Sequence, residues 1–393
     1  MTTGQLTPPG DRDLPHYVND APFDARTIEQ LTPAQERIYL ASQWKLMWWK
    51  FKRHRIAVWC GWFLVAMYLI AVFAEFLAPY NLDSRHIKRI YHPPQGVHLF
   101  HDGSFIGPFV YDTSYELNMV NLKREYTLLE DRPLQLRFFC EAEPYEMWGF
   151  IPMDTHLFCA PEGETAFLLG TDRLGRDMLS RIIYGARISL SIGLLGVAIS
   201  FTLGIVIGGL AGYYGGWVDM VVQRIIEVIQ SIPSIPLWLA LAAIMPVTWN
   251  PLVVYFAITV ILGLLDWTGL ARAVRSKLLA LREEDYVLAA QLMGASPKRI
   301  ISRHLVPGFI SHLIATATIS IPTMILGETA LSFLGLGLRP PITSWGVLLT
   351  EAQNINVVAL YPWLILPVVP VILVILAYNF LGDGLRDAAD PYK

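Results

Sequence analysis

The stretch RAVRSKLLALREEDYVLAAQLMGASPKRIISRHLVP, residues 272–307, is a polar interruption between two long apolar segments. In its middle, an acidic run at 283–285 stands where a helix N-terminus favours negative charge. The residues that follow have helical spacing on one face: Tyr286, Ala289, Ala290 and Met293. The pattern predicts a short helix with a shallow, alanine-bearing face that suits a partner.

A sharp turn is predicted directly after this helix. Gly294 can adopt a positive φ, Ser296 is a good N-cap, and Pro297 fits the first turn of a following helix. Residues 283–307 therefore predict a helix-turn-helix elbow. The segment is also compatible with an ordinary polar loop of some other membrane protein.

The composition sets the class of the protein. Hydrophobic residues make up 54% of the 393 residues and charged residues only 16%, with a mean hydropathy of +0.42. Several stretches are long enough to cross a bilayer, so the chain is expected to be a polytopic membrane protein rather than a soluble globule. Nothing in the sequence supports nucleic acid binding, and the net charge of −3 does not identify a partner.

The N-terminal part divides into three predicted segments. Residues 1–33 are polar and lack the apolar stretch of a signal peptide, so they are expected to form a loose cytoplasmic tail. Residues 34–55 place Trp44, Trp48 and Phe51 at helical spacing beside basic residues, which predicts an amphipathic helix in the membrane interface. Residues 56–78 form the first predicted span.

Residues 79–185 are a hydrophilic insertion that is expected to be extracytoplasmic. Short alternating runs flank the turn HDGS at 101–104, which predicts a β-rich subdomain that ends in a collar before the next span. Cys140 and Cys159 both lie in it, whereas Cys60 lies in the first span. Cys140 and Cys159 are predicted to form a disulfide, with two separate buried thiols as the alternative.

Five further spans follow, and basic residues orient them. Lys and Arg crowd the loop at 272–307 but are nearly absent from 246–250 and 335–356, so the basic loop and both termini are expected to be cytoplasmic. Prolines interrupt several spans, which predicts a helix bundle around a pathway. Residues 382–393 are expected to be a C-terminal tail. The predicted spans are 188–210, 220–245, 251–270, 309–334 and 357–381.

Two carboxylates inside spans are candidate functional groups. Asp266 and Glu328 have no partner close in sequence, so either could line a solute pathway or form hydrogen bonds between helices. Glu227 follows Arg224 by three residues, so a local ion pair explains it better. The histidines are dispersed without an H-E-x-x-H spacing, and no metal site is predicted.

Four stretches resemble the permeases of ATP-binding-cassette (ABC) importers. The elbow resembles their ATPase-docking loop, although Leu288 stands where a Glu is usual. The residues GTDRLGRDMLSR at 170–181, the run at 328–346 and the carboxyl end at 382–391 are similar to signatures of the dipeptide, oligopeptide and nickel branch. The resemblance assigns ATPase coupling to Tyr286, Ala289, Ala290, Gly294, Ala295 and Pro307, and the family signature to Gly170, Thr171, Asp172, Gly175, Arg176 and Asp177.

The resemblance implies an all-α, six-span fold of the type I importer kind and a permease of the bacterial cytoplasmic membrane that works by alternating access. It also implies four partners, namely a second homologous permease, two ATP-binding subunits and an extracytoplasmic solute-binding protein. ATP and Mg would belong to the partners, because the chain has no Gly-Lys dipeptide and so no phosphate-binding P-loop. An enzymatic activity of the chain itself is therefore not expected.

Two alternatives and the choice of solute stay open from the sequence. An ion-coupled secondary transporter would use its buried carboxylates for coupling but would give the elbow no purpose. An intramembrane enzyme would need a nucleophile or metal cluster that the spans lack. Peptides, nickel chelates, glutathione, oligosaccharides and antibiotics are all compatible with the motifs.

Overall fold

The computed structural model describes residues 40–119, 123–246 and 248–389. The described residues from 49 onward belong to one compact unit, and residues 40–48 are assigned to another. The predicted tail at 1–33, the first residues of the predicted interfacial helix, and Asp390 and Pro391 of the carboxyl-end motif lie outside the described residues. The described part of that interfacial helix is α2 (Gln43–Arg53).

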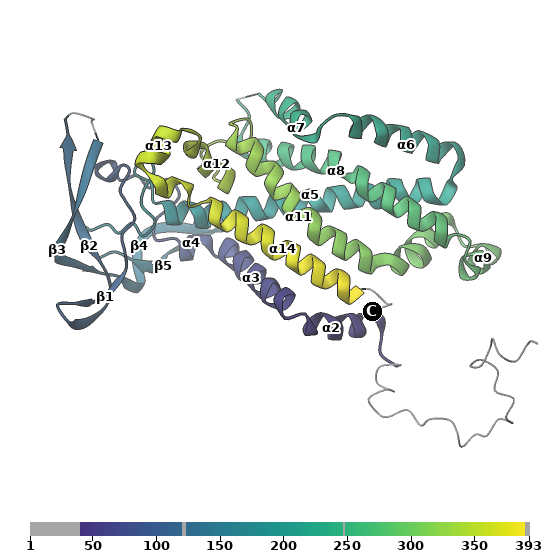
Figure 1. Cartoon of the computed structure of the whole chain (residues 1–393), viewed down its shortest axis with the longest axis horizontal. Coiled ribbons are helices and arrows are strands. Elements are labelled where there is room, and N and C mark those ends of the chain that lie inside the picture. The colour runs from purple at the N-terminus through teal and green to yellow at the C-terminus, as the bar shows by residue number, and fades with distance from the viewer. Residues whose placement is uncertain (1–39, 120–122, 247, 390–393) are drawn as a thin grey trace, which may run out of the picture. The chain divides into compact units, whose positions relative to one another are not determined.

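Long apolar helices dominate the described residues. Five of them are long and apolar enough to cross a bilayer, and a sixth is counted if the bent pair α6 and α7 forms one span. Figure 1 shows α5, α8, α11 and α14 lying side by side. All six predicted spans have a counterpart. The main helices are α3 (Arg55–Val72), α5 (Met178–Tyr214), α6 (Gly216–Ser231), α7 (Ser234–Ala243), α8 (Pro251–Leu281), α11 (Ile310–Phe333) and α14 (Val368–Ala389).

The span predicted at 220–245 is not continuous. Helices α6 and α7 meet at a bend of 83°. Pro233 lies at the break, where it cannot donate a backbone hydrogen bond to the preceding turn. The break agrees with the predicted interruption of this span by prolines, and the segment is two helices.

Three helices extend beyond the predicted apolar spans into polar sequence. Helix α5 begins at Met178, inside the predicted insertion, and α8 runs to Leu281, inside the predicted loop. Helix α14 extends to Ala389, through most of the predicted tail. Hydropathy detects the apolar part of a helix, whereas its backbone hydrogen bonds continue wherever a cap or tertiary packing supports them.

The insertion contains two antiparallel sheets, so the predicted β-rich character is confirmed. One sheet has the order β1-β2-β3 and the other pairs β4 with β5. Asp102 and Gly103 have φ values of 47° and 78° and connect His101 to Ser104, as a two-residue hairpin turn requires. The strands are β1 (His98–His101), β2 (Ser104–Asn118), β3 (Lys123–Gln135), β4 (Arg137–Met147) and β5 (Ile151–Cys159).

The second sheet brings the two predicted cysteines together. The structure joins Cys140 on β4 to Cys159 at the end of β5, with Cα atoms 6.3 Å apart. This separation is within the roughly 4.4–6.8 Å that disulfides span. Of the two alternatives left open by the sequence, the structure contains the disulfide.

Short elements connect the sheets and the spans. Helix α3 ends at Val72 and a separate turn, α4, follows, so the first predicted span does not continue unbroken to residue 78. The short elements outside the elbow are α4 (Ala74–Leu77), η2 (Ile87–Arg89), α12 (Trp345–Leu349), η5 (Thr350–Gln353), α13 (Ile355–Leu360) and η6 (Pro362–Ile365).

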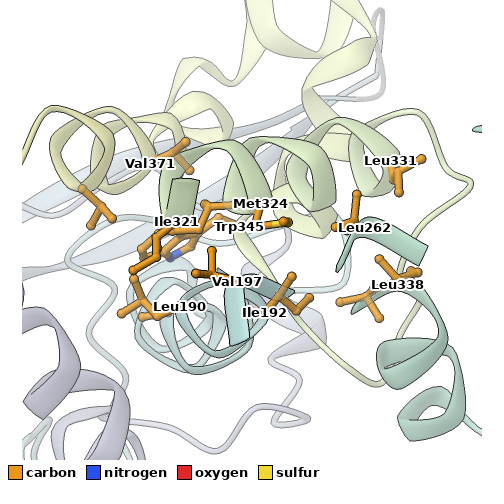
Figure 2. Packing of buried hydrophobic residues seen from close by; sticks show 14 of the residues in the cluster. Leu190, Ile192, Val197, Leu262, Ile321, Met324, Leu331, Leu338, Trp345 and Val371 are labelled. Atoms are coloured by element: carbon orange, nitrogen blue, oxygen red, sulfur yellow. The ribbon is translucent and has the colours of Figure 1, made fainter. Parts of the chain in front are cut away.

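Trp345 is at the centre of the main apolar core. Its side chain is fully buried, and Figure 2 shows it among Leu190 of α5 and Ile321 and Met324 of α11. Its indole Nε1 donates a hydrogen bond to the carbonyl oxygen of Ile182 at 3.0 Å. A buried indole needs such an acceptor, so the short helix α12 is held against both long helices.

Glycines allow α5 to pack directly on α8. A Cβ at Gly204 would lie 2.8 Å from Leu270 Cδ2, and one at Gly212 would lie 2.8 Å from the carbonyl oxygen of Arg275. A Cβ at Gly208 would overlap the backbone of Ala271. Small residues at every fourth position thus bring the two backbones into contact, as in other membrane helix pairs.

The disulfide predicts how the cysteines react with an alkylating reagent. In the unfolded but non-reduced protein, only Cys60 should be modified, because Cys140 and Cys159 have no free thiol. After reduction all three cysteines should be modified. Intact-mass spectrometry distinguishes one adduct from three, and three adducts without reductant would rule out the bridge.

The glycine contact predicts a position-dependent effect of one substitution. Gly208→Val should destabilise the protein by about 1–3 kcal/mol or more, because the added atoms force α5 away from α8. Gly269→Val is the matched control, since a Cβ there meets nothing within 4 Å. The thermal unfolding midpoint of the detergent-purified protein measures both, and equal midpoints for the two variants would contradict the role assigned to Gly208.

Candidate functional site

The predicted elbow is present in the structure. Helix α9 (Asp285–Leu292) follows the end of α8, and Gly294 has a φ of +79°. The amide of Ala295 donates to the carbonyl of Ala290 at 3.0 Å, and that of Gly294 to Gln291 at 2.9 Å. These two bonds close the helix in the manner of a Schellman motif, so the predicted positive φ at Gly294 is confirmed.

The second arm of the elbow starts as predicted and then continues into the next span. Ser296 caps α10 (Pro297–Arg299), with its hydroxyl accepting from the amide of Arg299 at 3.4 Å. A π-helical turn, η3 (Ile300–Leu305), and a 3-10 turn, η4 (Val306–Phe309), then lead into α11. Pro307 is exposed within η4.

The face of α9 that was expected to be common to four residues is divided. Ala290 is 2% exposed and Val287 is fully buried, and both pack in a cluster with Val274, Leu278 and Ile300. Tyr286, Ala289 and Met293 are exposed. The prediction that Ala290 lies on the same exposed face as Tyr286, Ala289 and Met293 is wrong. Ala290 lies on the same side of α9 as the bulkier Val287, and that side packs against the helix bundle. Ala295 is half-buried.

The exposed end of α9 carries large apolar side chains, and two of them, Leu288 and Leu292, were not among the residues predicted to face a partner. Leu292 is 89% exposed and Met293 is 81% exposed, next to the half-exposed Tyr286 and Leu288. We call these four residues the elbow patch. Leu288, where a Glu is usual in the family, therefore adds apolar surface. An exposed cluster of this kind at a helix end is typical of a protein contact.

The family signature forms a buried ionic centre around Asp172. One carboxylate oxygen accepts from the amides of Leu174 and Arg176 at 2.8 and 2.9 Å. The other accepts from Arg176 Nε at 2.7 Å and from a terminal nitrogen of Arg181 at 2.5 Å. Asp172 is fully buried and all its bonds are charge-assisted or to backbone amides, so it fixes the turn rather than serving as a reactive group.

The other signature residues join this turn to its neighbours. The hydroxyl of Thr171 donates to the carbonyl of Arg89 at 2.5 Å and accepts from the amide of His92 at 2.8 Å. Asp177 caps α5 by accepting from the amide and hydroxyl of Ser180, both at 2.7 Å. Burial raises the pKa of Asp177 to about 6 and lowers that of His92 to about 4.

The glycines of the signature leave no room for side chains. A Cβ at Gly170 would lie 2.9 Å from the Trp363 ring, and one at Gly175 would overlap the backbone of His86. The predicted salt-bridged collar is therefore a packed junction between the insertion, α5 and the segment before α14.

The two candidate carboxylates in the spans have different surroundings. Glu328 is fully buried and accepts from the hydroxyls of Ser344 and Ser332 at 2.6 and 2.7 Å, with Ser189 at 3.5 Å. These bonds join α5, α11 and the N-cap of α12. Asp266 on α8 is half-buried, and no hydrogen bond or ion pair joins it to another described residue. Glu227 pairs with Arg224 at 2.7 Å, as predicted.

Within residues 40–119, 123–246 and 248–389, no group of three or more His, Cys, Asp or Glu side chains is placed to hold a metal ion. Two features of the described residues are candidates for a function. One is the ionic junction at the start of α5, and the other is the exposed apolar elbow in the segment after α8.

Comparison with known proteins identifies the family. The family described as "Binding-protein-dependent transport system inner membrane component" matches residues 204–392, and "N-terminal TM domain of oligopeptide transport permease C" matches residues 42–94. Two similar permeases and one solved structure were also found.

The dipeptide transport system permease protein DppC of Alkalihalophilus pseudofirmus is 41% identical over 56% of this chain and 71% of its own length. The glutathione transport system permease protein GsiD of Pectobacterium atrosepticum is 32% identical over 89% of this chain and 91% of its own. A solved structure of the MetNI methionine ABC transporter covers 53% of this chain and 97% of that chain, with 20% identity and a TM-score of 0.39.

These matches extend from the first span through the elbow to α14, the same segments that carry the signature junction and the ATPase-docking resemblance. The chain belongs to the family of binding-protein-dependent inner membrane transport components, and it is a permease of the DppC and OppC kind.

Proposed function

We propose that this chain is one of two homologous permease subunits of an ATP-driven importer of short peptides in the bacterial cytoplasmic membrane. The observation that carries the proposal is the elbow patch, an exposed apolar surface on the loop that resembles the ATPase-docking loop of such importers. Two relatives of the chain are named for dipeptides and for glutathione, and glutathione is itself a short peptide. A peptide backbone is the chemistry common to those solutes.

The proposed orientation places the elbow in the cytoplasm and the β-sheets outside. Helix α5 runs from the Asp172 junction to the side of Arg275, near the end of α8 from which the elbow departs. Its 37 residues correspond to about 55 Å at 1.5 Å per residue, enough to extend beyond both surfaces of a bilayer. Basic residues concentrate at the elbow end, which favours the cytoplasmic side and places both termini there.

In this proposal the chain contributes the pathway and its partners contribute the energy. Two ATP-binding subunits would bind ATP and Mg and dock on the elbows, and a solute-binding protein would deliver the peptide from outside. The chain itself would not hydrolyse ATP, since its sequence contains no P-loop. Closure of the ATPase subunits would push on α9 and tilt the helices connected to it. In alternating access, such a tilt changes the side of the membrane to which the pathway opens.

The structure supports a direct route for that push. Val287 and Ala290 of α9 pack in one cluster with Leu278 of α8 and Ile300 and Leu305 of the second arm. A displacement of α9 is therefore transmitted to α8 and α11 together. Asp266 on α8 remains the candidate for lining the pathway, whereas the serine bonds of Glu328 favour the alternative of hydrogen bonding between helices.

Replacing an apolar residue of the elbow patch should weaken ATPase docking. Leu292→Asp adds a charge to an 89% exposed position, so the fold should be kept while roughly tenfold or more of the affinity for the ATPase subunits is lost. Ile355→Asp on α13, at an 82% exposed position away from the elbow, is the matched control. Co-purification of the ATPase subunits measures both; equal recovery for Leu292→Asp and wild type would remove the elbow patch from the interface.

The energy source gives the test of the proposed function. In liposomes containing the complete complex, uptake of a labelled tripeptide should stop when ATP is removed and persist when a protonophore collapses the ion gradient. An ion-coupled carrier would give the opposite pattern. Gradient-driven uptake by this chain alone would refute the assignment as a subunit.

A further inference from the structure

A cavity of 460 Å³ lies beside the Asp172 junction, between the start of α5 and the segment that connects α11 with α14. Four arginines line it together with one carboxylate, and this set is Arg173, Arg176, Arg181, Arg339 and Glu351. Its volume is in the range of sites that bind small molecules. The mechanism proposed above gives this cavity no role.

The cavity carries an excess of positive charge. Among the described residues, the ion pairs of these four guanidinium groups are with two carboxylates, those of Glu351 and of Asp172, which lies behind the lining. Two of the four positive charges are therefore not balanced locally. Arg176 and Arg181 are almost completely buried, where burial strengthens their attraction for an anion. An anion inside the cavity would therefore be stabilised.

Two of the arginines have donors available for a ligand. Arg339 is exposed and forms no hydrogen bond or ion pair with any described residue. Arg173 is 63% exposed and reaches Glu351 only at 3.5 Å. By contrast, Asp172 holds Arg176 and Arg181 in place by direct bonds, so they contribute a fixed positive background. A planar guanidinium fork matches the two oxygens of a carboxylate.

The remaining lining is apolar and aromatic. Leu338, Val347 and Val357 contribute aliphatic surface, and Tyr91 lies at the wall with its ring stacked on that of Tyr361 at 4.0 Å between centroids. The site thus combines a cationic end with an apolar wall. A short peptide presents the matching pair of groups, namely a terminal carboxylate and uncharged side chains next to it.

We propose that this cavity binds the terminal carboxylate of the transported peptide, with Arg339 and Arg173 as its ligands. The inference rests on the proposed function, because it needs a peptide substrate. In the proposed orientation, the junction end of α5 is outside, so the cavity would receive the peptide as the binding protein releases it. Its concave form suits a small solute better than the side chain of a docked protein.

The test uses the complete complex in liposomes and compares uptake of trialanine with uptake of trialanine amide. The amide keeps the N-terminal ammonium group but lacks the negatively charged C-terminal carboxylate. Wild type should take up the free acid faster than the amide. Arg339→Gln should lower that ratio by roughly threefold to tenfold, and Arg339→Lys should retain most of it because the charge remains. Because the same binding protein is present in every preparation, a change in the ratio between variants is caused by the permease.

Arg132→Gln is the matched control, an exposed arginine on β3 outside the cavity, and its ratio should equal that of wild type. Arg173→Gln tests the second ligand in the same way and should also lower the ratio. If Arg339→Gln and Arg173→Gln slow both peptides equally or change neither, the carboxylate site is overturned while the peptide importer stands. If wild type takes up neither peptide with ATP, the proposed function fails and this inference fails with it.

Discussion

The direct contact between the backbones of α5 and α8 is the constraint on which the rest of the structure depends. Gly204, Gly208 and Gly212 occupy one side of α5, and each faces atoms of α8 at a distance that excludes any side chain. In a bilayer, lipid tails are as apolar as the side chains, so packing of this closeness replaces the hydrophobic drive that joins helices in water. Helix α5 carries the buried junction at one end, and near its other end Tyr213 packs against the cluster that holds α9.

The junction shows how a polar insertion is joined rigidly to an apolar bundle. Asp172 collects two backbone amides and two guanidinium groups in a site without solvent, and Thr171 joins the same turn to Arg89 and His92. Arg187 of α5 joins two neighbouring helices in a similar way, since its terminal nitrogens each donate to Glu75 of α4 at 2.6 Å and its Nε donates to the carbonyl of Ala71 of α3. Buried ions of this kind are tolerated only when each has its partner, so the set acts as a unit.

The two functional surfaces differ as the proposed partners differ. The elbow patch is apolar and exposed, as expected for a surface that is covered by a folded subunit. The cavity beside the junction is concave and cationic, as expected for a small anionic solute. Between them, Trp345 and Glu328 tie α12 to both α5 and α11, and Phe201 of α5 packs both against the core around Trp345 and against the cluster that holds α9.

Local sequence patterns were enough to predict the membrane class, the positions of six spans, the β-rich insertion and the turn at Gly294. These depend on local composition and on residues with a fixed backbone preference, and such signals do not require distant contacts. The signature motif also identified a salt-bridged collar, because Asp and Arg among glycines at close spacing must pair when buried. Which side of a helix faces inward, and where a helix ends, depend instead on contacts between distant parts of the chain. Ala290 is buried because Val287 on the same side of α9 packs on α8. Helix α14 continues to Ala389 because Gly382 and Gly384 let it approach other helices at Ile319 and Ala57.

The arginine cavity could not be predicted from the sequence, since Arg173 and Arg339 are 166 residues apart and only the fold brings them to one wall. Long-range packing sets these features, and no local pattern encodes it.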